Sequence, residues 1–157
     1  MKNNKGFSLV ELIIVIAIMA ILVGVMAPQL IKYIEKSKVS ADTQLADSVH
    51  TALLTAMMDP EIVNYSGYNA EYQKYLTATS VSGIDTGVGT IGSGALEIMG
   101  AAAAGDVAGS LKSTISGTKD VKFQITGTNS LSVWIPGSDA SGSKGRNTNT
   151  SSMIVVK

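Results

Sequence analysis

The stretch MKNNKGFSLVELIIVIAIMAILVGVMAP, residues 1–28, decides the fold of this chain. A short basic leader ends at Gly6, and Phe7 begins an apolar run that a single acid, Glu11, interrupts. The 21 residues from Phe7 to Ala27 would span about 31 Å as a helix at ~1.5 Å per residue, which matches the thickness of a bilayer core. The sequence therefore predicts an N-terminal helix that is long and apolar enough to cross a membrane.

Two lysines set the expected orientation of that helix. Lys2 and Lys5 precede the apolar run, and basic residues stay preferentially on the cytoplasmic side of a membrane. We therefore expect the N-terminus to be cytoplasmic and the rest of the chain to lie beyond the membrane.

Glu11 needs an explanation, because a carboxylate at the centre of a membrane helix costs about 2.5–3.5 kcal/mol on insertion scales. A cleaved secretory signal peptide and an ordinary single-span anchor both share the basic and apolar regions, but neither has a use for the acid. Pro28 also directly follows Ala27, where a signal peptide would place its cleavage site. The acid is explained better by a third interpretation.

In that interpretation the chain is cut between Gly6 and Phe7. The new α-amino group then lies four residues before Glu11, about one helical turn away in sequence. In a stack of helices, the Glu11 carboxylate of one subunit would meet the α-ammonium group of a neighbour. Removing one partner of such a buried pair typically costs ~3–5 kcal/mol. The acid would thus set the axial register between subunits and would have no catalytic role.

The sequence KGFSLVEL, followed by an unbroken apolar run, resembles the class III leader and N-terminal helix of type IV pilins and their pseudopilin relatives. The resemblance implies that prepilin peptidase cuts after Gly6 and that Phe7 becomes the N-methylated first residue. It also implies that Glu11 is the acid used in assembly and that Pro28 is the family's helix-kinking proline. These motifs cover about the first 30 residues of the chain.

Helical periodicity continues beyond Pro28. Apolar residues recur at spacings of three and four up to Asp59-Pro60, where the proline should end the helix. The predicted helix therefore runs from Phe7 to Met58, with weak points at Gly24 and Pro28 and a kink at the proline. The resemblance implies that Ala20–Pro28 becomes extended or melted in filaments, and a simple kink is the alternative. The expected apolar face comprises Leu30, Ile31, Ile34, Ala41, Leu45, Val49, Ala52, Leu53, Ala56 and Met57, and the polar face comprises Lys32, Glu35, Lys36, Asp42, Gln44 and Asp47.

Short helices and loops are expected over residues 59–120. Glu71–Thr77 is predicted as a short helix, and the five glycines of Gly83–Gly94 predict a loop. Ala95–Ile115 is rich in alanine but interrupted by glycines, so we expect one or two short helical turns there.

The C-terminal part, residues 121–157, predicts a three-stranded antiparallel sheet. Val121–Thr126 and Leu131–Ile135 alternate apolar and polar residues, with a hairpin turn at Gly127–Ser130 between them. Gly137–Ser152 is a polar loop, and Met153–Val156 forms the last strand. The fold class is therefore α+β, with a long kinked helix packed on a small sheet, as the resemblance to type IV pilins also implies.

These elements give three expected regions. Residues 1–6 form the cleaved leader, and residues 7–28 form the hydrophobic half of the helix, which serves as membrane span and filament core. Residues 29–157 form the globular pilin domain, which begins with the amphipathic helix half at 29–58.

Composition excludes several classes of function. The 12 basic and 12 acidic residues balance to a net charge of +0, so no nucleic-acid partner is expected. The chain has no cysteine and one histidine, His50, and we expect neither a metal site nor a cofactor. No spacing typical of a nucleophile and its base occurs, which predicts a protein that is not an enzyme.

The function predicted is that of a structural subunit of a type IV pilus. The subunit would wait in the cytoplasmic membrane as a single-pass protein and then polymerise with identical subunits into a surface filament. Its partners would be prepilin peptidase and the pilus assembly machinery, and the filament would serve adhesion, motility, biofilm formation or uptake. A pseudopilin of a type II secretion or competence system is the alternative.

Overall fold

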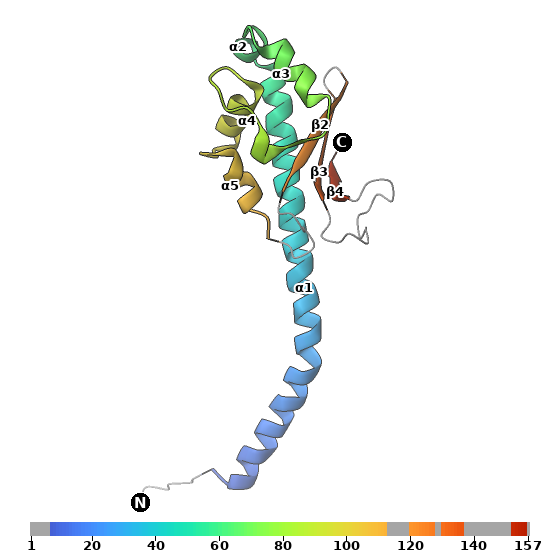
Figure 1. Ribbon diagram of the computed structural model, residues 1–157. Helices are drawn as coiled ribbons and strands as arrows, with labels where there is room; N and C mark the ends of the chain where they lie inside the picture. The colour runs from blue at the N-terminus through green and yellow to red at the C-terminus, as the bar shows by residue number, and fades with distance from the viewer. Residues whose placement is uncertain (1–6, 113–119, 128–129, 137–151, 157) are drawn as a thin grey trace, which may run out of the picture. The chain divides into compact units, whose positions relative to one another are not determined.

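The computed structural model describes residues 7–112, 120–127, 130–136 and 152–156. The chain forms two compact units, which divide between Ser37 and Lys38. The first unit contains the N-terminal part of helix α1 (Leu9–Met58), and the second contains the rest of α1, the shorter helices and the sheet (Figure 1). The predicted α+β class, a long N-terminal helix with a small antiparallel sheet, is confirmed.

Helix α1 has the predicted C-terminal end and begins two residues later than predicted. It ends at Met58 because Asp59, which precedes Pro60, has extended backbone angles (φ −71°, ψ 121°). Asp59 then caps helix α2 (Pro60–Val63), since its Oδ1 accepts a hydrogen bond from the backbone nitrogen of Glu61 at 2.9 Å.

Within the second unit, one face of α1 is buried. The helical periodicity of the sequence predicted this face from Val49 onward. The buried residues of this helix are Asp42, Ala46, Val49, Ala52, Leu53, Ala56 and Met57. Asp42 is a correction, because the sequence placed it on the polar face. Its carboxylate is fully buried and accepts a hydrogen bond from the backbone nitrogen of Lys112 at 2.8 Å. That bond satisfies part of the hydrogen-bonding capacity of a buried charged group.

The sheet has the strand order β1-β2-β3-β4 and is antiparallel throughout. The three predicted strands correspond to β2 (Lys122–Gly127), β3 (Ser130–Pro136) and β4 (Ser152–Val156). A two-residue strand that the sequence did not predict, β1 (Thr79–Ser80), pairs with the outer edge of β2. Within the described residues, the hairpin between β2 and β3 shows an irregular register after Ile125. Residues 128–129 of the predicted turn and residues 137–151 of the predicted loop lie outside the described residues.

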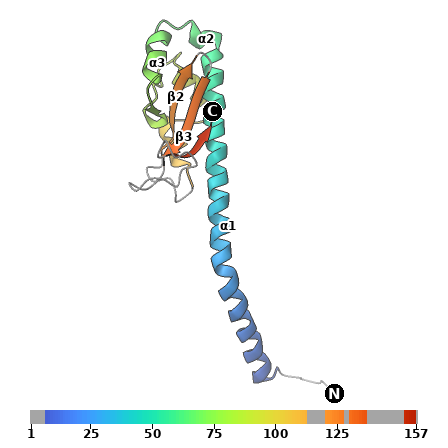
Figure 2. The same cartoon turned by 90° about the vertical axis from the view of Figure 1, so that its right-hand side faces the viewer.

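The inward face of the sheet is the alternating set that the sequence predicted. Phe123 and Ile125 of β2 and Leu131, Val133 and Ile135 of β3 are all buried. In the view of Figure 1, the sheet of the second unit lies to the right of α1, and helices α4 (Ile91–Met99) and α5 (Ala104–Gly109) lie to its left. Figure 2 shows β2 and β3 running beside α1.

His50 connects the helix to the sheet. Its Nε2 lies 3.1 Å from the backbone oxygen of Leu131 in β3. The single histidine is thus a half-buried packing residue of the second unit.

The region between α2 and β2 is more helical than the sequence indicated. The predicted helix at Glu71–Thr77 is α3 (Tyr68–Tyr75), and a 3-10 turn, η1, covers Val81–Gly83. The prediction of a continuous loop at Gly83–Gly94 is wrong, because α4 already begins at Ile91. Thr90 starts this helix by accepting a hydrogen bond from the backbone nitrogen of Ser93 on its hydroxyl group, at 3.1 Å. A left-handed glycine, Gly100 (φ 65°), ends it.

A buried polar cluster fixes α4 against α3. The Glu71 carboxylate accepts hydrogen bonds from the backbone nitrogens of Ile91 at 2.9 Å and Gly92 at 3.3 Å, which are the first residues of α4. The Tyr75 hydroxyl donates to Glu71 Oε1 at 2.9 Å and accepts from the backbone nitrogen of Asp85 at 3.0 Å. Burial raises the pKa of the Tyr75 hydroxyl well above its ordinary value. Through its bonds to Ile91 and Gly92, the Glu71 carboxylate caps the N-terminus of α4, where the helix dipole places a partial positive charge.

Candidate assembly site

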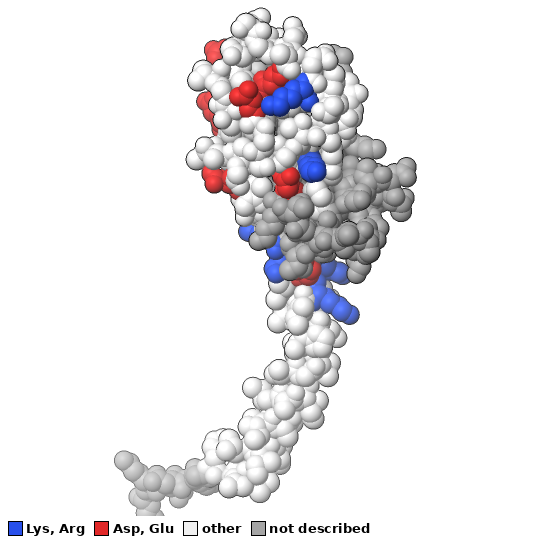
Figure 3. All heavy atoms as spheres, viewed as in Figure 1, with Lys and Arg blue, Asp and Glu red and all other residues white. Residues whose placement is uncertain are grey.

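The apolar part of α1 is uncovered in the single chain. From Leu12 to Ile31 the helix has no charged side chain, and this stretch is white in Figure 3. The exposed large side chains in it are Leu12, Ile13, Ile14, Val15, Ile16, Ile18, Met19, Ile21, Leu22, Val23, Val25, Met26, Leu30 and Ile31. An apolar surface of this extent needs a partner, because water disfavours it and soluble monomers rarely expose one so large.

By length and composition, α1 is the one helix within the described residues that is apolar enough to cross a membrane. None of its most apolar window is buried by the rest of the chain. The predicted apolar residues Leu30, Ile31 and Ile34 belong to the first unit, and all three are exposed there.

Glu11 lies in the first turn of α1 and caps it. Its Oε2 accepts a hydrogen bond from the backbone nitrogen of Ser8 at 2.9 Å. The Ser8 hydroxyl accepts one from the backbone nitrogen of Val10 at 3.3 Å, and the Ser8 carbonyl accepts one from Leu12 at 3.3 Å. Ser8 and Glu11 therefore satisfy donors that the start of a helix otherwise leaves without partners.

This cap is a role of Glu11 that the sequence reasoning missed. The signal was present, because a serine three residues before a glutamate, directly ahead of an apolar run, is the typical pattern of a capping box. The predicted pair between Glu11 and the α-amino group of Phe7 on a neighbour involves a second copy, so it stays a prediction. Phe7 itself is exposed at the start of the described residues, and Gly6 lies outside them.

Gly24 and Pro28 both lie inside α1, which continues through them. Proline has no backbone N–H, so Pro28 cannot donate to the carbonyl of Gly24 four residues earlier, and its ring crowds that carbonyl. A Cβ placed on Gly24 would meet nothing within 4 Å. Gly24 and Pro28, the two predicted weak points, are the two ends of one missing backbone hydrogen bond. The kink at Pro28 stays a prediction.

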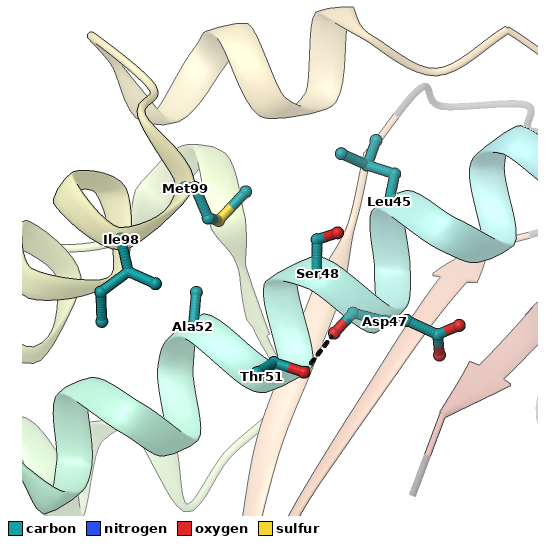
Figure 4. A pocket seen from close by; sticks show the side chains of 7 residues that line it. All are labelled: Leu45, Asp47, Ser48, Thr51, Ala52, Ile98 and Met99. Carbon is teal, nitrogen blue, oxygen red and sulfur yellow. Dashed lines mark hydrogen bonds between the residues drawn. The ribbon is translucent and has the colours of Figure 1, made fainter.

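The second unit has a hollow on α1, next to α4. Leu45, Asp47, Ser48, Thr51 and Ala52 of α1 line it together with Ile98 and Met99 of α4 (Figure 4). Its hydroxyl groups bond within their own helix, since Thr51 donates to the Asp47 carbonyl and Ser48 donates to the Gln44 carbonyl, both at 2.9 Å. No group of three or more metal-ligating side chains occurs among the residues that the structure describes.

The family model for the prokaryotic N-terminal methylation motif matches residues 1–27. No solved structure matches the chain.

The curated relatives are fimbrial proteins. Type IV major fimbrial protein FimA of Dichelobacter nodosus is 42% identical over 56 residues, which are 36% of this chain and 36% of that protein. Another FimA from this species is 32% identical over 89 residues, which are 54% of this chain and 57% of that protein. The fimbrial protein of Moraxella nonliquefaciens is 44% identical over 55 residues, which are 35% of this chain and 36% of that protein.

The chain thus spans between about a third and somewhat over half of the length of the curated relatives it matches. The family model and these relatives confirm the resemblance that Gly6, Phe7 and Glu11 indicated. In its N-terminal motif, its fold and its relatives, this chain resembles the type IV pilins.

Proposed function

We propose that this chain is a structural subunit of a type IV pilus and polymerises through α1 into a surface filament. The observation that carries the proposal is the uncovered apolar surface of α1 from Leu12 to Ile31, headed by the acid Glu11. Packing against the same helix of other subunits removes that surface from water without any further domain. The curated relatives are fimbrial proteins, and the FimA proteins among them are type IV major fimbrial proteins, which supports a pilus subunit and does not favour the pseudopilin alternative.

The N-terminus of the mature subunit is part of the proposal. Prepilin peptidase would remove residues 1–6 by cutting between Gly6 and Phe7, and Phe7 would then be N-methylated. The match of the methylation motif to residues 1–27 supports both steps. Cleavage leaves an α-amino group next to the capped first turn of α1.

Glu11 would pair with that α-amino group on a neighbouring subunit. The acid already lies in the first turn of α1, and its cap uses Oε2. A carboxylate has acceptor capacity beyond one hydrogen bond, so it can cap its own helix and also bind a neighbour's ammonium group. Neutralising both charges inside an apolar bundle would fix the axial register of the subunits.

Before assembly the subunit would span the cytoplasmic membrane once through α1. The length and apolar character of that helix support this placement, and Lys2 and Lys5 support a cytoplasmic N-terminus. The role proposed for the chain is structural and not enzymatic.

Electron microscopy of surface filaments, combined with mass spectrometry of their protein, tests the proposal. We expect filaments in which this chain is the dominant protein and begins with methylated Phe7. A mature protein that still begins with Met1, or surface filaments without this chain, would contradict it.

A further inference from the structure

A groove on the second unit combines carboxylates with exposed apolar side chains. Its volume is about 610 Å³, and it lies between α2, the loop that precedes α4, and α4 itself. The lining residues are Asp59, Glu61, Ile62, Thr86, Val88, Gly89, Ser93, Gly94, Glu97 and Ile98. Three of them are acids and none is basic, so the lining of this groove has a net negative charge.

Val88 is the most exposed large apolar residue of the described chain, at 94%. Hydrogen bonds hold the loop that presents it. The Thr90 hydroxyl donates to the Gly87 carbonyl at 2.7 Å, and the Gly87 nitrogen donates to Asp85 Oδ1 at 2.9 Å. Ile98, half exposed, adds apolar surface from the α4 side of the groove. Val88 and Ile98 therefore give the groove two exposed apolar side chains beside its acids.

The complementary surface lies on α1 in the first unit. Lys32 and Lys36 are one helical turn apart, and both are exposed. Tyr33 is exposed between them, and the Lys36 ammonium group lies 5.8 Å from the centre of its ring. Two exposed lysines and an exposed aromatic ring in one short segment match a groove that offers carboxylates and aliphatic side chains.

Membrane topology gives these two lysines no role. With a cytoplasmic N-terminus, Lys32 and Lys36 follow the apolar span and lie on the opposite side of the membrane. A basic pair on that side does not contribute to the orientation that Lys2 and Lys5 favour.

We propose that Lys32, Tyr33 and Lys36 of one copy dock into the groove formed by Glu61, Glu97 and Val88 of a second copy. This inference rests on the proposed function, because it names a contact between subunits of the filament. The lysines pair with the carboxylates, and the tyrosine ring contacts the aliphatic side chains. The contact adds a charge-specific match to the apolar packing of α1, and it selects neighbours in the correct register.

Charge reversal tests the pairing in the full-length chain. Glu61→Lys with Glu97→Lys is expected to lower the yield of surface filaments by about tenfold or more, because it places like charges together. Lys32→Glu with Lys36→Glu is expected to do the same, although it improves the charge asymmetry across the membrane. Combining all four substitutions restores the pairs with opposite polarity, and we expect the yield to recover.

The matched controls reverse exposed charges elsewhere on the second unit, as in Asp47→Lys and Lys74→Glu. These variants should assemble like the wild type. Equal losses in the controls, or no recovery in the fourfold variant while it still inserts into the membrane, would overturn the docking. If the wild type and both charge-reversed pairs all form normal filaments, the docking is overturned and the pilus function stands. If the wild type forms no filaments, the pilus function itself is contradicted.

A disulfide test does not depend on filament yield. The chain has no cysteine, so Val88→Cys combined with Lys36→Cys introduces the only two thiols. Oxidation of filaments should link successive subunits and give a ladder of oligomers on a non-reducing gel. Each single variant can give dimers at most, and Val88→Cys with Lys74→Cys should give no ladder. A ladder from that control pair, or none from the test pair in intact filaments, contradicts the docking.

Discussion

Glu11 accepts a hydrogen bond from the backbone nitrogen of Ser8 at 2.9 Å, so the acid of the apolar segment caps its own helix. From the sequence alone, we expected a partner on another subunit to offset the free-energy cost of placing this carboxylate in an apolar segment. The cap provides a first partner within the chain and leaves acceptor capacity for a second. Capping inside the subunit and charge pairing between subunits are therefore compatible roles for one carboxylate.

Two substitutions of Glu11 separate these roles. Glu11→Gln keeps an acceptor oxygen for the Ser8 nitrogen but removes the charge, whereas Glu11→Ala removes both. We expect both variants to insert into the membrane and both to lose most of their surface filaments, because each lacks the ion pair. Membrane fractionation and electron microscopy measure the two properties. Normal filaments from Glu11→Gln would contradict the ion pair, and if Glu11→Ala then still failed, the cap would be the role that matters.

Glu71→Ala is expected to destabilise the second unit by about 1–3 kcal/mol, since it leaves buried donors without a partner. The donors are the backbone nitrogens of Ile91 and Gly92 and the hydroxyl of Tyr75. Denaturant unfolding of the detergent-solubilised chain, followed by circular dichroism, measures the loss. Glu97→Ala is the control, because that glutamate is exposed on α4. A loss at Glu97 as large as the loss at Glu71 would argue against the buried cap.

Gly92→Ala tests how closely α4 approaches the preceding loop. A Cβ at this position would overlap the Asp85 carbonyl oxygen and would lie 2.7 Å from Ile84 Cγ1. The backbone oxygen cannot move away as a flexible side chain can, so we expect a clear drop in melting temperature. Gly105→Ala in α5 is the control, since its Cβ would meet nothing within 4 Å. That variant should be neutral, or more stable by about 0.5–1 kcal/mol. Equal melting temperatures for the two variants would contradict the close approach.

Tyr75 predicts a loss of stability in strongly alkaline solution. Burial raises the pKa of its hydroxyl above the ordinary value of 10.0, so the folded chain holds this proton more tightly than the unfolded chain. The contribution is fully present below about pH 10 and declines as the pH rises further. Unfolding measured from pH 8 to pH 11 should therefore show a steeper decline for the wild type than for Tyr75→Phe. Parallel curves would contradict the assignment.

The sequence predicted the elements whose signal is local. The period of α1 from Val49 to Met57 and the alternation in β2 and β3 each depend on neighbouring residues, and Pro60 marks the end of the helix by its own chemistry. Such patterns reflect which side of an element meets the core. The cap formed by Ser8 and Glu11 is equally local, because it depends on a serine three residues before a glutamate.

The contacts that the sequence did not predict join residues far apart in the chain. Glu71 caps a helix that begins 20 residues later, and Asp42 accepts a hydrogen bond from a residue 70 positions away. A buried carboxylate is indistinguishable in sequence from a solvated one on a polar face. Strand β1 was missed for a similar reason, because two residues have no periodicity and pair only because β2 lies beside them.

The sequence by itself determined the apolar N-terminal segment with its acid, the extent of α1 and the three main strands, because hydrophobic period and proline chemistry act over a few residues. Only the tertiary structure decided which carboxylates are buried and which acids gather with Val88 around one groove. Those outcomes depend on how separate elements pack, and packing brings together residues that no local pattern relates.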